Sequence, residues 1–360
     1  MATPPETLSA VDRPTGRALA MATWLADVEA LTARAAWPEA RASLERDLDA
    51  VGATAELCAL YGECLLRLGQ PADALAWLEP RLHGFGGSAN RRAFVRIVNL
   101  SGAAAFELGR IDEAAFFFEL ARERAVAMGD HLTGARALNN LALVASTRGQ
   151  WSTALQYYQQ AIPSYERVGS VRGVAESYHN IAATLIESGD LSEAEEWHRR
   201  AMELARDNGN DRLRAFILAG RAEVRLRQRD VEMARVLGTQ AARVFDTLED
   251  RSSQAHALGV VGQAELSAPG DEGAAARRAL ETLTTAVALA RQSGVVRVLA
   301  DCLVAHARAA RVTGDRTTAK TDLTEALSGF QSLGAGDRVT LVNGLLAELA
   351  ADESRGRREW

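Results

Sequence analysis

The chain has 360 residues, of which 48% are hydrophobic and 6% aromatic, and its formal net charge is -6. Because the excess charge is negative, the chain as a whole does not attract a phosphate backbone, and we expect no nucleic acid among its partners. No segment approaches the roughly 20 apolar residues of a membrane helix, and the N-terminal segment lacks the apolar core of a signal peptide, so we expect a cytoplasmic protein with no membrane partner.

Residues 1–14 contain three prolines and scattered polar groups, which predicts a disordered N-terminus. From residue 15 to residue 336 one helical unit recurs. Its clearest copy lies at 135–161, where apolar residues at helical spacing are followed by a glycine and by a second helix with alanine and an aromatic residue on one face. Residues 175–201 repeat this pattern forty residues later. The repetition predicts stacked helix pairs that form one continuous domain.

An alanine in the second helix marks each copy of the unit. The series is Ala40, Ala74, Ala114, Ala154, Ala194, Ala234, Ala279 and Ala319. The intervals are 34 residues, then 40 four times, then 45 and 40, so eight helix pairs are expected. Glycines in register with these alanines should end the first helices, because glycine tolerates the left-handed backbone of a helix end. They are Gly69, Gly109, Gly149, Gly189 and Gly314, and Arg229 occupies that position in the sixth pair.

This unit resembles the tetratricopeptide repeat (TPR), a helix-turn-helix in which small residues let paired helices approach closely. The resemblance implies an all-α fold, a right-handed superhelical α-solenoid of about eight TPR-like helix pairs. The roughly six residues beyond the common unit of about 34 are similar to the long repeats of kinesin light chains, cell-polarity adaptors and bacterial peptide-sensing regulators. Arginine usage also indicates a bacterial source, since Lys320 is the one lysine among 41 basic residues.

Two segments interrupt the repeat. Residues 83–91 place three glycines between the second and third pairs, where we expect the superhelix to bend or flex. Residues 267–275 add five residues to the turn of the seventh pair and should project as a loop. Residues 337–351 are predicted to form a helix that caps the last apolar face, followed by a charged tail at 352–360.

The resemblance implies that first helices line a concave groove, so the lining follows from position within the repeat. The residues assigned to it in the third to fifth pairs are Arg96, Asn99, Arg136, Asn139, Asn140, His179 and Asn180. Asparagine is unfavourable inside a helix, so its recurrence favours a binding role. A carboxamide can bond a peptide N–H and C=O together, and in peptide-binding members of the family an asparagine at the position of Asn140 and Asn180 does so. The third pair has Leu100 at that position and carries its amide at Asn99 instead.

Arg96 and Arg136 lie one repeat apart on the same wall of the expected groove. Guanidinium groups bind carboxylates in a bidentate manner, so the expected partner is a protein or peptide that carries acidic groups. Asparagine and arginine on an exposed helix face can also be solvated surface, and that alternative stays open at this point.

These patterns favour a non-catalytic interaction scaffold or adaptor that binds a peptide segment of a partner in its groove. One alternative is a regulatory sensor that binds a signalling peptide or small molecule and changes the curvature of the superhelix. A second is an accessory subunit docked through its convex face, where aromatic residues recur every forty residues at Trp77, Phe117, Tyr157 and Trp197. Packing is the competing explanation for these aromatic residues, and the oligomeric state stays open.

Catalysis is not expected. The six histidines show no metal-ligand spacing, and the three cysteines form no Cys-x-x-Cys pair. No glycine-rich phosphate loop or nucleophile elbow is present in the sequence. We therefore predict no catalytic residue, no metal and no cofactor.

Overall fold

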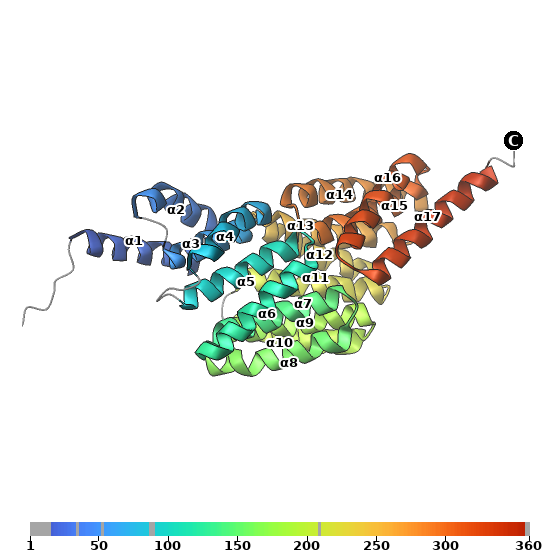
Figure 1. The fold of residues 1–360 in the computed structure, drawn as a ribbon. Coiled ribbons are helices and arrows are strands. Elements are labelled where there is room, and N and C mark those ends of the chain that lie inside the picture. The colour runs from blue at the N-terminus through green and yellow to red at the C-terminus, as the bar shows by residue number, and fades with distance from the viewer. Residues whose placement is uncertain (1–15, 34–35, 52–53, 86–90, 208–209, 357–360) are drawn as a thin grey trace, which may run out of the picture.

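The computed structural model describes residues 16–33, 36–51, 54–85, 91–207 and 210–356. Within these ranges the chain forms seventeen α-helices and no strand, which confirms the predicted all-α repeat fold. The helices are α1 (Gly16–Ala33), α2 (Trp37–Val51), α3 (Ala55–Arg67), α4 (Pro71–Phe85), α5 (Arg91–Glu107), α6 (Ile111–Met128), α7 (His131–Thr147), α8 (Trp151–Arg167), α9 (Val171–Ser188), α10 (Leu191–Asp207), α11 (Asp211–Arg227), α12 (Val231–Thr247), α13 (Arg251–Leu266), α14 (Glu272–Ser293), α15 (Val296–Val312), α16 (Arg316–Ser332) and α17 (Gly336–Gly356). Figure 1 shows the pairs winding from α1 at one end of an elongated molecule to α17 at the other.

The turns within the second to sixth helix pairs and within the eighth follow one pattern. After α7, Gly149 has φ of 73°, its N–H donates to the Ser146 carbonyl at 3.0 Å, and the Gln150 N–H donates to the Ala145 carbonyl at 2.9 Å. These bonds satisfy carbonyl groups that the helix end leaves without partners, and they require the left-handed backbone at Gly149. Arg229 adopts the same conformation in the sixth pair, with φ of 64°. A residue with a Cβ atom is strained there, so the predicted turn is kept at a local energetic cost.

Aspartate side chains begin several of the helices. Asp130, Asp230, Asp250 and Asp315 each accept a hydrogen bond from the backbone N–H three residues later. Such a cap satisfies one of the free N–H groups at a helix N-terminus and contributes about 1 kcal/mol. The positions of the turns are therefore fixed at both sides, by capping aspartates and by left-handed residues.

Small residues set the spacing within the pairs. All eight marker alanines are buried, none with more than 1% of its surface exposed. At Gly102 an added Cβ would lie 2.7 Å from the ring of Phe118, so only glycine lets that ring lie across α5. The large partners at this position of the second helix, Phe118 and Tyr158 among them, are buried as well. Close helix contact therefore depends on alanine and glycine facing aromatic or aliphatic residues.

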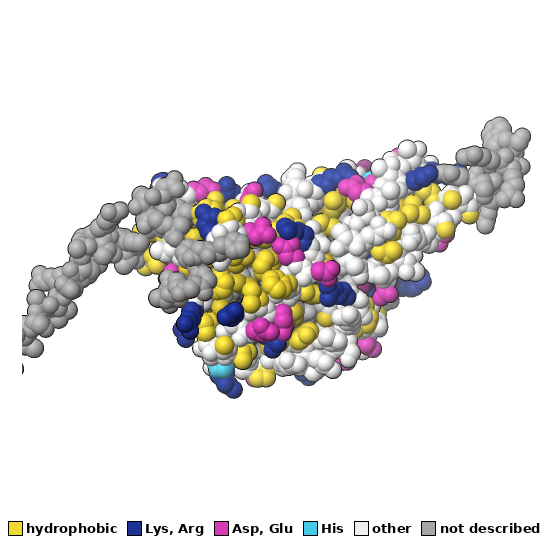
Figure 2. Space-filling view, in the orientation of Figure 1, with side chains coloured by type: hydrophobic (Ala, Val, Ile, Leu, Met, Phe, Trp, Pro, Cys, Tyr) yellow, Lys and Arg dark blue, Asp and Glu magenta, His cyan; other side chains and the backbone are white. Residues whose placement is uncertain are grey.

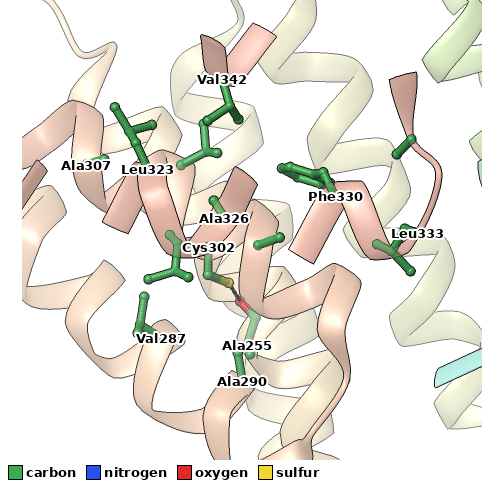
Figure 3. Close-up of a cluster of buried hydrophobic side chains, with 14 of the residues drawn as sticks. Ala255, Val287, Ala290, Cys302, Ala307, Leu323, Ala326, Phe330, Leu333 and Val342 are labelled. Carbon is green, nitrogen blue, oxygen red and sulfur yellow. Dashed lines mark hydrogen bonds between the residues drawn. The ribbon is translucent and has the colours of Figure 1, made fainter. Parts of the chain in front are cut away.

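The C-terminal helices share the largest cluster of buried apolar residues. It contains Phe330, Leu333 and Val342, and Figure 3 shows them gathered around α15 and α16. The buried Cys302 thiol lies 3.5 Å from the Ala255 carbonyl, to which it donates a weak hydrogen bond. α17 thus covers the apolar face of the last pair, as a capping helix does.

The segment 267–275 differs from its prediction as a projecting loop. Residues 267–271 form the turn, and α14 begins at Glu272 and has 22 residues, where α12 and α16 have 17. The insertion is therefore taken up largely by a longer helix, because the added alanines are strong helix formers. α17 continues to Gly356, so residues 352–356 extend the helix where a tail was predicted. The predicted disordered N-terminus and residues 86–90 of the glycine-rich segment lie outside the described residues.

None of the helices in the described ranges is both long enough and apolar enough to cross a membrane.

Candidate functional site

A cavity of about 1240 Å³ lies inside the superhelix. Its lining comes mainly from the first helices of the pairs, from Arg67 on α3 through His179 on α9 to Arg338 on α17. A pocket for one small molecule has a volume of roughly 300–1,000 Å³, so this cavity is larger than a single small ligand requires. Its continuity along many helix pairs gives it the proportions needed for an extended segment of chain.

Two of the predicted asparagines are engaged inside the wall. The Asn140 carboxamide donates to the Asn99 carboxamide oxygen at 3.3 Å, and the Ser177 hydroxyl donates to the Asn139 oxygen at 3.1 Å. Asn99 and Asn139 are both buried, with 7% and 8% of their surface exposed. Their amides therefore connect α5, α7 and α9 to one another. Of the seven residues predicted to line the groove, His179 borders the cavity, and the four asparagines and two arginines lie outside its lining.

Asn140 and Asn180 are half-buried, each one residue further along its helix. Among the described residues, the side chain of Asn180 has no hydrogen-bond partner, whereas its backbone carbonyl accepts from Thr184. A carboxamide with unused donors and acceptors beside a groove can bond a peptide backbone. Asn180 is consequently the amide with the greatest capacity for a ligand.

The predicted arginines differ in their surroundings. Arg96 is bonded to Glu63 of α3, and Arg67 lies 3.6 Å from the same carboxylate. Burial opposes the charge of Glu63, but Arg96, Arg67 and Arg136 together hold its pKa at about 2. Arg136 is exposed and makes no ion pair with any residue that the structure describes. Arg136 can therefore bind a ligand carboxylate without first breaking an ion pair within the protein.

A second ion pair lies on α9, the first helix of the fifth pair. Arg172 donates to Glu176 at 2.8 Å, both on α9. Burial opposes the charge of Glu176, yet Arg172, Arg67 and Arg136 lower its pKa. Arg67, Arg96, Arg136 and Arg172 thus lie near Glu63 and Glu176, while Glu107 on α5 and Glu187 on α9 border the cavity itself. A positive group beside a partly dry cavity favours an anionic partner.

His179 has an apolar and aromatic environment. Its ring stacks on that of His198 with 5.5 Å between ring centroids and lies 5.8 Å from the ring of Phe216. Burial, with a smaller contribution from His256, lowers the pKa of His179 to about 4, so the ring is neutral at pH 7. Its Nδ1 atom is buried without a hydrogen-bond partner among the described residues. A neutral ring of this kind offers a stacking surface and a hydrogen bond, but no charge.

Several residues of the cavity were not assigned from the sequence. Arg212 lies forty residues after Arg172, and it bonds Asp250 at 2.6 Å across two helix pairs. Phe216 lies forty residues after Glu176. Continuing the same repeat positions into the sixth pair would have found both residues. Glu107 has no such signal, because it lies at the end of α5, outside the positions assigned to the groove.

Glu107 lines the cavity opposite these groups. Burial, reinforced by the charge of Asp250, raises the pKa of Glu107 to about 7. The cavity lining therefore holds a weakly acidic carboxyl group, whereas the strongly acidic Glu63 lies outside the lining. Figure 2 shows that acidic and basic side chains are also interspersed on the outer face in view.

The groups needed for metal chemistry do not come together in the ranges that the structure describes, where no cluster of three or more His, Cys, Asp or Glu could hold a metal ion. The three cysteines are buried, and burial raises the pKa of Cys64 to about 12. Their thiols are therefore protonated and packed.

A comparison with known protein families now identifies the repeats. A tetratricopeptide-repeat family model matches residues 95–167 and 173–247, which run from within α5 to the end of α8 and from within α9 to the end of α12. These residues are tetratricopeptide repeats. No curated protein matches its sequence at a significant level.

Solved structures share the fold of this TPR protein at low sequence identity. A Rap protein complexed with competence and sporulation factor is 15% identical, with a TM-score of 0.60 over 93% of this chain and 98% of the other. The Rap conjugation gene regulator of the plasmid pLS20, in complex with the Phr* peptide, is 17% identical, with a TM-score of 0.60 over 80% of each chain. The apo form of the quorum sensor NprR from B. thuringiensis is 13% identical, with a TM-score of 0.53 over 91% of this chain and 97% of the other.

The aromatic residues expected on the convex face of the TPR array are engaged in packing. Phe117 is buried with 8% of its surface exposed. The Trp77 indole N–H donates to the Cys58 carbonyl at 3.1 Å, and the Trp197 ring lies 5.0 Å from that of Tyr178. These contacts favour the packing explanation over an exposed docking strip.

Proposed function

We propose that this TPR protein is a non-catalytic binding protein that holds a peptide segment of a partner in its central cavity. The observation that carries the proposal is the cavity of about 1240 Å³, lined by first helices from α3 to α17. Two of the structures that share the fold are complexes, one with competence and sporulation factor and one with the Phr* peptide. That likeness supports a peptide as the class of ligand.

The ligand carries an acidic group that binds at Arg136. This guanidinium is exposed, has no ion pair among the described residues, and lies outside the cavity lining, where its charge helps to lower the pKa of Glu63 and of Glu176. Asn140 and Asn180 take the backbone of the ligand, and His179 provides a neutral ring beside it. Arg96, Asn99 and Asn139 were predicted to contact the peptide, and we propose that they support the site instead. They hold Glu63 and the neighbouring helices in position.

A regulatory sensor is the second candidate function. It is favoured by contacts between helices far apart in the sequence, such as Glu187 on α9 with Arg338 on α17, because such contacts can open or close the superhelix around a ligand. An adaptor binds with its shape unchanged, whereas a sensor changes its curvature. Small-angle scattering with and without the bound peptide separates the two, since a sensor changes its radius of gyration.

A peptide array tests the binding function. Fluorescently labelled protein is applied to random-sequence peptides and to the same peptides with Asp and Glu replaced by Asn and Gln. The proposal predicts that the acidic versions bind more strongly. Arg136→Gln should weaken binding to them by about tenfold, the effect of one lost charge-assisted hydrogen bond.

The matched control for the array is Arg243→Gln. Arg243 is an exposed arginine on α12, a second helix, whereas Arg136 lies on α7, a first helix. Its replacement removes the same charge from the molecule and should leave binding unchanged. Equal losses in the two variants would show that net charge alone attracts the peptides, and the proposed site would be wrong.

A further inference from the structure

Two turns of the superhelix meet along a seam between α5–α9 and α15–α17. At the α5–α6 turn, a Cβ added to Gly109 would lie 3.1 Å from the Ser332 hydroxyl and 3.5 Å from the Leu333 side chain. At the α7–α8 turn, a Cβ added to Gly149 would lie 3.2 Å from the Asp337 carboxylate. Residues about 190 to 220 positions apart in the sequence are thus in contact, and in Figure 1 the start of α17 lies beside the ends of α7 and α9.

Charged residues from four helices converge at this seam. The Arg338 Nη2 atom on α17 lies 2.8 Å from both carboxylate oxygens of Glu187 on α9. Arg227 on α11 approaches the same carboxylate at 3.4 Å and Arg297 on α15 at 3.9 Å. Burial opposes the charge of Glu187, but Arg338, Arg297 and Arg227 lower its pKa, so it is ionised at neutral pH. We refer to these four residues as the clasp.

The three arginines do not contribute equally to the clasp. Arg227 also pairs with Glu223 on its own helix at 3.1 Å, and Arg297 lies 3.8 Å from Asp301 on its own helix. Among the described residues, Arg338 makes its ion pair with Glu187, and the charges of Asp301 and Glu223 also act on it. The Glu187–Arg338 pair is therefore the member of the clasp with two hydrogen bonds between the two turns.

Apolar packing along the seam is incomplete. A second cavity of about 220 Å³ lies there, bordered by the clasp and by the side chains of Trp151, Phe330, Leu333 and Leu341. Apolar side chains also cross the seam, since Leu141 and Val144 on α7 belong to the same buried cluster as Leu333 and Val342. The charged contacts therefore act beside hydrophobic contacts, at the border of a cavity that the apolar side chains leave unfilled.

We propose that the clasp of Glu187, Arg227, Arg297 and Arg338 holds two turns of the superhelix together and closes the side of the central cavity. The same four side chains line the central cavity and the seam cavity, so their separation opens one into the other. The contact between the two turns is a property of the protein without ligand. The role of the clasp in controlling ligand entry rests on the proposed function.

A distance measurement across the seam tests the clasp. Cysteines are introduced at two exposed positions, Gln150→Cys beside the α7–α8 turn and Thr340→Cys on α17, and carry nitroxide labels. The native cysteines are buried and do not compete for the label. Double electron–electron resonance then gives the label-to-label distance in the full chain without any ligand. The clasp predicts one narrow distance in the otherwise unchanged protein.

Two variants break the clasp and one serves as a control. Glu187→Gln keeps the shape of the side chain and removes its charge, and Arg338→Gln removes the bridging cation. Each should lengthen the mean distance by about 10 Å, the diameter of one helix. Arg291→Gln breaks the exposed Arg291–Glu325 pair between neighbouring repeats and should leave the distance unchanged. Circular dichroism confirms that each variant is folded.

The distance decides the proposal regardless of ligand. An unchanged distance in both folded clasp variants would overturn it, as would an equal change in the Arg291→Gln control. If the distance lengthens but no acidic peptide binds in the array, the clasp stands and the proposed function fails. If peptides bind and the distance stays constant in the clasp variants, the binding function stands and the clasp is wrong.

Discussion

The wall formed by α5, α7 and α9 and the seam between α9 and α17 are held together in different ways. In the wall, polar side chains bond across neighbouring first helices at spacings close to one repeat, as Asn99 does with Asn140 and Asn139 with Ser177. At the seam, Glu187 and Arg338 are separated by 151 residues. The wall is thus a direct consequence of the repeat, whereas the seam depends on the curvature summed over three further helix pairs.

The largest effect on stability is expected from a substitution on α6, where a buried ring packs against α5 of the wall. Phe118→Ala removes a buried ring that lies over Gly102, and we expect a loss of about 3–5 kcal/mol in the free energy of unfolding. Urea denaturation followed by circular dichroism measures it. Phe116→Ala is the control, because that neighbouring ring is 63% exposed and its loss should change stability by less than about 0.5 kcal/mol. Equal losses would mean that Phe118 is not part of the core.

The dependence of stability on pH should differ in sign between two carboxyl groups, those of Glu107 and Glu63. Burial raises the pKa of Glu107 to about 7, so between pH 5 and 7 the unfolded chain loses this proton while the folded chain keeps it. Stability due to Glu107 therefore falls as the pH rises through this range. Glu107→Gln removes the penalty and should stabilise the protein by about 1–3 kcal/mol at pH 8 and much less at pH 5.

Glu63 should show the opposite dependence. Its pKa is about 2, so its stabilising contribution is present above the pKa of the unfolded chain and is lost as the pH falls from about 4.5 towards 2. Glu63→Gln should therefore destabilise the protein at pH 7 but have little effect near pH 2. Urea titrations of both variants at several pH values check the two signs. A Glu107→Gln effect that does not vary with pH would contradict the assigned environment.

A smaller effect distinguishes two asparagines within the wall. Asn139→Ala leaves the Ser177 hydroxyl without one partner in a buried position and should cost about 1–2 kcal/mol of stability. Asn180→Ala removes a side chain with no partner among the described residues, so its effect on stability should be within about 0.5 kcal/mol. Thermal or urea unfolding compares them. A reversal of this order would show that Asn180 is structural.

The smallest effect concerns the outer surface. The exposed Arg291–Glu325 pair joins α14 to α16 at 2.6 Å, and Arg291→Gln should change stability by about 0.5 kcal/mol or less. This pair resembles the clasp in chemistry but not in place, since it connects the second helices of neighbouring pairs. A large loss of stability on replacing Arg291 would contradict the view that ion pairs between neighbouring repeats contribute less than those at the seam.

The sequence predicts the structural features that recur with the forty-residue period. The marker alanines, the glycine turns and the position of Arg229 all follow from residue type and spacing, because each unit buries its small residues in the same way. The lining was predicted less well. Asn99 and Asn139 occupy helix positions that face the neighbouring first helix, so their amides are used inside the wall.

Other features have no signal in a repeat pattern. The split of the 267–275 insertion between a short turn and a longer α14 depends on local helix propensity. The raised pKa of Glu107 depends on its burial and on the charge of Asp250, and the contact of Glu187 with Arg338 depends on the pitch of the superhelix. Small rotations per repeat add up to these contacts, and a single unit does not reveal them.

A double-mutant cycle tests the central claim that an acidic group of a peptide binds at Arg136. The strongest acidic peptide from the array and its amide counterpart are titrated calorimetrically against the unmodified protein, Arg136→Gln and the control Arg243→Gln. We predict that the carboxylate and Arg136 are coupled by about 1.5–3 kcal/mol, so the amide peptide binds the unmodified protein and Arg136→Gln equally. No coupling with Arg136, or equal coupling with Arg243, would contradict the account.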